Sequence, residues 1–168
     1  MHPIQTYRLT LWLPLAVTLL FICLLVFYSV NEYQHRLFDI KEASKTQLQE
    51  TALQLGHSIE YAMANNDSQQ ARSSVARFTL RADAQLALLL DNNNLIESST
   101  YFIWQNQPAE KVLDEELIQY IELARSTQKI FEYGHDQDGL LTLILPLLEA
   151  NQGRVLVLQN SIKNKLKK

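Results

Sequence analysis

Residues able to do acid–base or metal chemistry are present in this chain, but they are scattered. The four histidines are His2, His35, His57 and His135, and none has a second ligand at metal-binding spacing. The sequence also lacks a glycine-rich phosphate loop, a His-Glu-x-x-His motif and a nucleophile elbow. We therefore expect no enzyme, no catalytic residue and no cofactor.

The densest polar cluster is HDQDG at residues 135–139. Its two carboxylates and its histidine are donors suited to a divalent ion, but a calcium loop needs more oxygen ligands and a later glutamate. A hairpin turn explains this Asp-x-Asp-Gly pattern more simply, so we predict no metal site. The acidic run at residues 114–116 is expected to complement the positive end of a helix.

Composition narrows the class of partner. Beyond residue 30 the chain has 14 basic and 18 acidic residues, a formal charge of −4, and no basic stripe. Nucleic acid is therefore not expected as a partner. The single cysteine, Cys23, excludes a disulfide within the chain and any cysteine-based metal site.

Residues 9–30 carry no charge, between Arg8 and Glu32. At about 1.5 Å of rise per residue, a helix of this length spans roughly 33 Å, enough to cross a bilayer. The stretch is longer than a signal-peptide core, and no small-x-small cleavage pattern follows it. We predict a transmembrane helix over 9–30, with a short cytoplasmic tail at 1–8 and lipid as its surroundings.

The orientation of this helix is open from charge alone. Arg8 marks the short side, whereas Arg36, Lys41 and Lys45 lie near the other end, so basic residues alone favour a cytoplasmic body. The architecture described below favours the opposite: a single-pass protein of the inner (cytoplasmic) membrane with its body in the periplasm.

A second helical pattern follows directly over 31–64, and no proline interrupts it. Its narrow stripe of apolar and small residues is typical of a seam between two helices, so we expect a homodimer through this juxtamembrane helix. The alternative is a helix that packs only on its own domain. The stripe consists of Tyr33, Leu37, Ile40, Ser44, Leu48, Ala52, Leu55, Ile59 and Ala62.

The rest of the chain, residues 65–162, reads as one mixed domain. Asp67 and Gln70 form a capping-box pattern for a helix ending near Asp83. A hairpin (85–91 and 95–104), a helix beginning near Asn106 and Pro108, and three strands (129–133, 140–148 and 154–161) complete it. The fold class is α+β: a transmembrane helix continuing into a long helix, then an antiparallel sheet of about five strands with flanking helices. A basic stub, 163–168, ends the sequence.

This order of elements resembles the extracytoplasmic PAS-like sensor regions, of Cache or PDC type, of bacterial membrane receptors. Such receptors include histidine kinases, chemoreceptors and cyclic di-GMP enzymes. The resemblance is carried by AMANND at 62–67, LLLDNNNLI at 88–96, LPL at 145–147 and GRVLV at 153–157. Asparagines replace the turn glycine usual in the family. Receptors of this type continue into an output domain, which this sequence lacks, so we expect a receptor fragment or a complete single-pass protein.

The resemblance implies a ligand cavity on one face of the sheet. The residues expected to line it are aromatic and apolar side chains on the second and third strands, with one arginine at the entrance, a combination suited to a small organic anion. They are Tyr101, Ile103 and Trp104, then Phe131 and Tyr133, and Arg81.

Two functions follow from these observations. The first is a sensor that detects a small molecule or a protein partner and transmits this state through the membrane helix in signal transduction. The alternative is a single-pass envelope interaction or scaffold protein of an assembly such as a secretion or pilus machine.

Overall fold

The computed structural model describes residues 4–135, 139–148 and 153–161. The chain divides into two compact units, Met1–Ile40 and Lys41–Lys168. We call the second unit the head.

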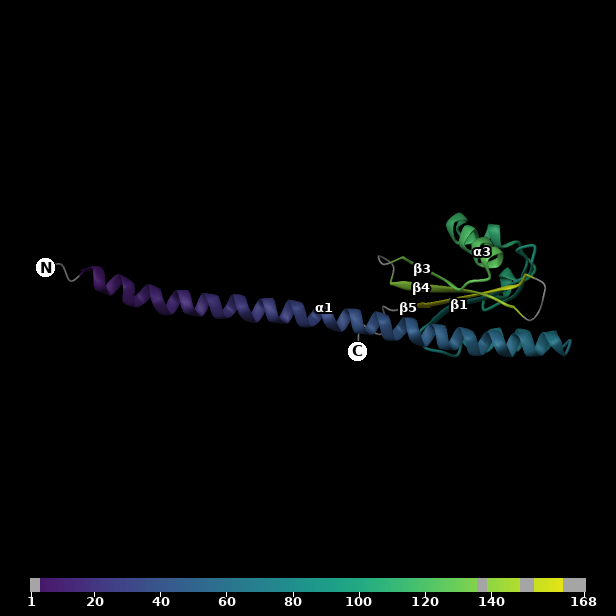
Figure 1. The fold of residues 1–168 in the computed structure, drawn as a ribbon, viewed down its shortest axis with the longest axis horizontal. Helices are drawn as coiled ribbons and strands as arrows, with labels where there is room; N and C mark the ends of the chain where they lie inside the picture. The colour runs from purple at the N-terminus through teal and green to yellow at the C-terminus, as the bar shows by residue number, and fades with distance from the viewer. Residues whose placement is uncertain (1–3, 136–138, 149–152, 162–168) are drawn as a thin grey trace. The chain divides into compact units, whose positions relative to one another are not determined.

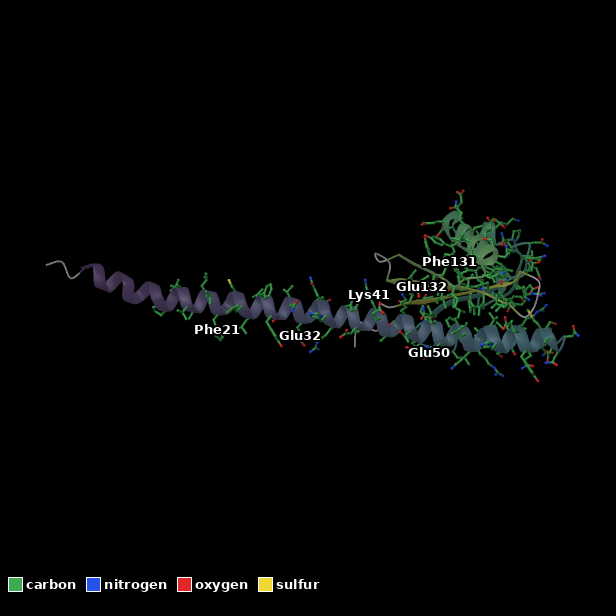
Figure 2. The ribbon with its side chains drawn as sticks, in the orientation of Figure 1. Phe21, Glu32, Lys41, Glu50, Phe131 and Glu132 are labelled. Carbon is green, nitrogen blue, oxygen red and sulfur yellow. The ribbon has the colours of Figure 1, made fainter. Side chains whose placement is uncertain are left out.

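One helix, α1 (Ile4–Ala64), contributes residues to both units (Figure 1). Every side chain described between residues 14 and 31 is exposed, and most are large and apolar, such as Phe21 (Figure 2). By length and composition, α1 is able to cross a membrane. The predicted continuity of the apolar helix with the juxtamembrane helix is confirmed.

The head contains a five-stranded antiparallel sheet, as predicted, with strand order β2-β1-β5-β4-β3. Its centre is β5, which pairs with β1 on one side and β4 on the other. The strands are β1 (Ala84–Leu90), β2 (Ile96–Ser99), β3 (Phe131–His135), β4 (Leu140–Pro146) and β5 (Val155–Ser161).

One face of the sheet is covered by the second part of α1 and by α2 (Ser68–Phe78). The α1 stripe lies in this core, with Leu48 and Ile59 fully buried and Ser44 nearly so. Over 44–62 the helix therefore packs on its own domain, which was the alternative to a dimer seam. Among the earlier stripe residues, Tyr33 is exposed.

Gly56 allows α1 to approach the sheet closely. A Cβ atom at this position would lie 2.7 Å from Leu145 Cδ2, well inside van der Waals contact. Leu145 and Leu147 fill the space that a side chain would need. The glycine, which the sequence shows only as tolerated within a helix, is thus part of the helix–sheet contact.

The opposite face is covered by α3 (Glu115–Thr127), whose Leu117, Ile121 and Ala124 pack with Ile144 and Val157. Residues of β4 alternate between the two cores: Leu143 and Leu145 face α1, and Ile144 faces α3. The prediction that both faces of the sheet are covered is confirmed.

Two predicted helix boundaries are wrong. The α2 helix ends at Phe78 and not near Asp83, because three-residue turns, from Leu80 N–H to the Arg77 carbonyl and from Arg81 N–H to the Phe78 carbonyl, replace the helical pattern. The α3 helix begins at Glu115, several residues after Pro108, and a short 3₁₀ turn, Ala109–Lys111, precedes it.

The β1–β2 turn is held by its own polar groups and by α3. The Asp91 carboxylate accepts hydrogen bonds from the N–H groups of Asn93 and Leu95, and Asn94 adopts a left-handed backbone (φ 59°). Arg125 donates to the Asp91 carbonyl and to the Asn94 side chain, both at 2.9 Å. It also donates to the carbonyl of Gly153, at 2.7 Å. Arg125 thus joins α3 to the β1–β2 turn and to Gly153, which precedes β5.

Polar contacts fasten α1 to the sheet at two points. Glu132 on β3 accepts a hydrogen bond from Gln49 and pairs with Lys45 at 2.7 Å. Glu60, a buried carboxylate, accepts a hydrogen bond from the Leu148 backbone N–H, also at 2.7 Å. Figure 2 shows Glu132 on the α1 side of the sheet and its neighbour Phe131 on the α3 side.

Truncating the buried face of α1 should unfold the head more readily than truncating its exposed face. We expect Ile59→Ala to lower the free energy of unfolding by about 3 kcal/mol, and Leu53→Ala, on the exposed face, by less than about 0.5 kcal/mol. Urea unfolding of the full chain in detergent measures both. A loss in Ile59→Ala that disappears at high protein concentration would instead indicate that the stripe pairs between two chains.

The Lys45–Glu132 ion pair should stabilise the folded head over a defined pH range. The hydrogen bond and charge of Glu132 raise the pKa of Lys45 above 10.5. A raised folded-state pKa means that the stabilisation is complete below pH 10.5 and is lost as the pH rises through the folded pKa. The stability difference between wild type and Lys45→Met should therefore shrink at high pH. A difference that stays constant to pH 11.5, or an equal effect of Lys129→Met, would contradict this.

Candidate functional site

The residues predicted on the second strand do not lie on it. β2 ends at Ser99, whose hydroxyl accepts a hydrogen bond from the Tyr101 N–H at 2.9 Å and turns the chain away from the sheet. Tyr101 then precedes a 3₁₀ turn that contains Ile103 and Trp104. The strand predicted over 95–104 is instead a short strand, β2, followed by a 3₁₀ turn.

This turn faces outward. The Tyr101 and Trp104 rings contact each other, with centroids 4.7 Å apart, and the Ile103 side chain is 74% exposed. Neither residue 101 nor 103 lines either of the two hollows described below.

Phe131 and Tyr133 lie on β3, as predicted. Both pack against the Tyr120 ring of α3, with centroids 6.3 and 5.2 Å away. The Tyr133 hydroxyl donates to Glu116 at 2.9 Å, and desolvation together with this acceptor raises the pKa of Tyr133. These rings are core residues on the α3 face.

Arg81 lies on the other face of the sheet, beside α1. Its Nη1 donates to Thr51 Oγ1 at 2.6 Å, and its Nε lies 3.5 Å from Asp83. Of the six predicted residues, Trp104, Phe131 and Tyr133 pack against the core on the α3 face, Tyr101 and Ile103 are exposed, and Arg81 lies on the α1 face.

A partly open cleft of about 490 Å³ lies at the end of α1, and its volume is within the range of small-molecule sites. We call it the cleft. Its helical wall is the end of α1 and the start of α2, and its other wall comes from β1, β2 and the loops around them. The helical wall consists of Met63, Ala64, Asn66, Ser68, Ala71 and Arg72.

The sheet wall of the cleft is dominated by an ion pair. Arg154 binds the Glu97 carboxylate through Nε and Nη2, each at 2.8 Å, and both side chains are largely buried. This fork-to-fork geometry fixes the two charges at the wall. Asn106, Leu89 and Leu95 complete it.

The cleft offers binding groups and no reaction machinery. Met63, Ala71 and Leu89 supply apolar surface, whereas two asparagine amides and the exposed Arg72 supply polar contacts. Asn66 and Asn106 both have left-handed backbones (φ 56° and 62°), which asparagine tolerates better than most residues. No histidine or cysteine is among the lining residues, and the one carboxylate is paired. The arrangement suits a small organic molecule that carries polar groups.

Sequence reasoning missed this cleft. Asn66 and Asn106 were assigned to helix boundaries, and Arg154 to the start of a strand. Each of these roles is local, and the cleft arises only when residues 63–72, 89–106 and 154 meet in the fold. The asparagines just outside helices were the one signal available.

No metal site is found in the parts of the chain that the structure describes, where no three histidine, cysteine or acidic side chains gather. The polar turn at 135–139 falls mostly outside them, since residues 136–138 are not described. The basic stub at 163–168 is also outside.

No model of a known protein family matches this chain, and no curated protein matches it either. The resemblance to PAS-like sensor regions therefore stays a prediction. What the structure adds to it is the α+β architecture and the location of the cleft.

Proposed function

We propose that this chain is a membrane-anchored sensor module, with its head outside the cytoplasm and with α1 as the element that transmits the state of the head. The observation that carries the proposal is the double role of α1. The same helix contains the apolar membrane-length segment and supplies the buried stripe on which the sheet packs.

The cleft is placed where a ligand would act on α1. Met63 and Ala64 are the last residues of that helix, and they face Glu97 and Arg154 across the cleft. A ligand can shift a conformational equilibrium only if it binds one state better than the other. A ligand that spans this junction would have such a preference, because its contacts depend on how α1 lies against the sheet.

The packing of α1 favours discrete states over gradual deformation. The buried stripe, the Gly56–Leu145 contact and the Glu60 and Glu132 hydrogen bonds all define one register of α1 on the sheet. A displaced helix would have to exchange these contacts as a set, which is how packed elements act as switches.

A five-stranded antiparallel sheet with helices on both faces supports a PAS-like sensor domain, of the kind that the resemblance implies. A homodimer remains part of the proposal, but over 44–62 the stripe is buried within the head. The pairing surface is then the membrane segment, continued by exposed residues such as Tyr33 and Phe38.

A second function, an interaction or scaffold protein of an envelope assembly, is favoured by one observation. The turn after β2 exposes three apolar side chains in a row, Tyr101, Phe102 and Ile103, and Phe102 is 83% exposed. Adjacent exposed apolar residues of this kind are typical of protein contacts.

The orientation of the head can be read from reporter fusions in bacterial cells. We expect alkaline phosphatase joined after Lys168 to be active, because this enzyme matures only outside the cytoplasm, and a fluorescent reporter that requires the cytoplasm to be dark. Deleting residues 9–30 should abolish the phosphatase activity. Activity with the opposite pattern would place the head in the cytoplasm and remove the sensor proposal in its present form.

Transmission through α1 can be measured by disulfide trapping in membranes. Single cysteines at Ile22, Cys23, Leu24 and Leu25, in a Cys23→Ser background where needed, sample one full turn of the helix. If α1 pairs in a dimer, at least one of these positions should cross-link strongly on oxidation.

A side chain that fills the cleft should then change the cross-linking yield. Ala64→Trp places a ring in the cleft as a substitute for a ligand, and Ala76→Trp is the matched control at an exposed alanine of α2. We expect only Ala64→Trp to alter the pattern. Equal patterns in both variants would argue against the sensor, and a photo-cross-linker at Phe102 that traps one discrete protein would then favour the scaffold.

A further inference from the structure

A second hollow, of about 250 Å³, lies between α1 and α2, separate from the cleft. We call it the groove. Two arginines of the α2 side line it, Arg77 in the last turn of the helix and Arg81 four residues later. Its other polar side chains are Thr51, Gln54 and Ser58 from α1 and Ser74 from α2.

Two positive charges line the groove, and one of them is balanced by an acid outside its lining. None of its lining residues is acidic. Among the described residues, the exposed guanidinium of Arg77 has no hydrogen-bond or ion-pair partner, whereas Arg81 is paired with Asp83, whose Oδ1 lies 3.5 Å from its Nε. A basic residue at the end of α2 also suits the helix dipole, but the dipole does not explain a second arginine turned toward α1.

Two hydrogen bonds fix side chains of the groove between α1 and α2. Thr51 accepts the hydrogen bond from Arg81 Nη1 and so fixes the guanidinium against α1. At the other end of the groove, the hydroxyl groups of Ser58 and Ser74 are 3.1 Å apart and join the two helices directly. The Arg77 guanidinium and the Gln54 side chain also line the groove, so an anion held there would meet donors from both helices.

The ligand class follows from these donors. A guanidinium presents planar pairs of N–H groups that match the oxygens of phosphate and carboxylate. The groove is small, and Leu55 and Phe78 give it an apolar floor. From these features we infer that it binds a small oxyanion, a phosphate or a short carboxylate, between Arg77 and Arg81.

Such an anion would bridge α1 and α2. Because it binds only the folded head, it would stabilise the docking of these helices by mass action. This inference concerns a different site from the cleft, so it stands or fails independently of the proposed sensor function.

Calorimetric titration of the full chain in detergent tests the inference, with inorganic phosphate and butyrate as probes and sodium chloride at equal ionic strength as the baseline. We expect one of the two probes to bind, and Arg77→Gln to weaken that binding about tenfold or more, the effect of losing a charged hydrogen bond. Lys129→Gln is the control, since Lys129 is an exposed cation that lines neither the groove nor the cleft.

Each outcome of the titration either supports or overturns the inference. Binding of phosphate alone assigns the site to phosphoryl groups, and binding of butyrate alone assigns it to carboxylates. Arg81→Gln provides a second variant, with circular dichroism to confirm that the head remains folded. Heats equal to those of chloride for both probes, or equal weakening by Lys129→Gln and Arg77→Gln, would overturn the inference.

Discussion

The close contact of α1 with the sheet is the constraint on which the head depends. At Gly56 the helix lies so near Leu145 that no side chain fits between them, and Leu48 and Ile59 on either side are fully buried. A helix held this closely has one well-packed register, because interiors leave few voids and tolerate little overlap. The sheet face, the groove and one wall of the cleft all take their positions from this contact.

Both the cleft and the groove border α1, because the two faces of the sheet are packed differently. On the α3 face, the rings of Tyr120, Phe131 and Tyr133 contact one another at a tilt and pack against the edge of the core, so they are engaged in packing. On the α1 face, the short α2 helix covers only part of the sheet. The hollows lie at its margins, where Arg72 and Arg77 remain exposed.

The elements that the sequence predicted correctly are those with a strong repeating pattern or a local hydrogen bond. The uncharged run at 9–30 predicted an unbroken helix, and the stripe that follows it predicted a buried helix face, which is found over 44–62. The Asp67 cap is also as predicted, since its carboxylate accepts the Gln70 N–H at 2.9 Å. The stripe could not reveal its partner, because burial against another chain and burial against one's own sheet leave the same pattern.

The site was harder to predict because its residues have no common local signal. Tyr101 and Trp104 have strand-forming side chains, yet the Ser99 hydroxyl ends β2 before them, and this hydrogen bond is invisible to a propensity argument. Glu97 and Arg154 are 57 positions apart and meet only through the pairing of β2, β1 and β5. A family alignment is the usual means of finding such pairs. Here the ion pair, the two left-handed asparagines and the end of α1 identify the cleft from geometry alone.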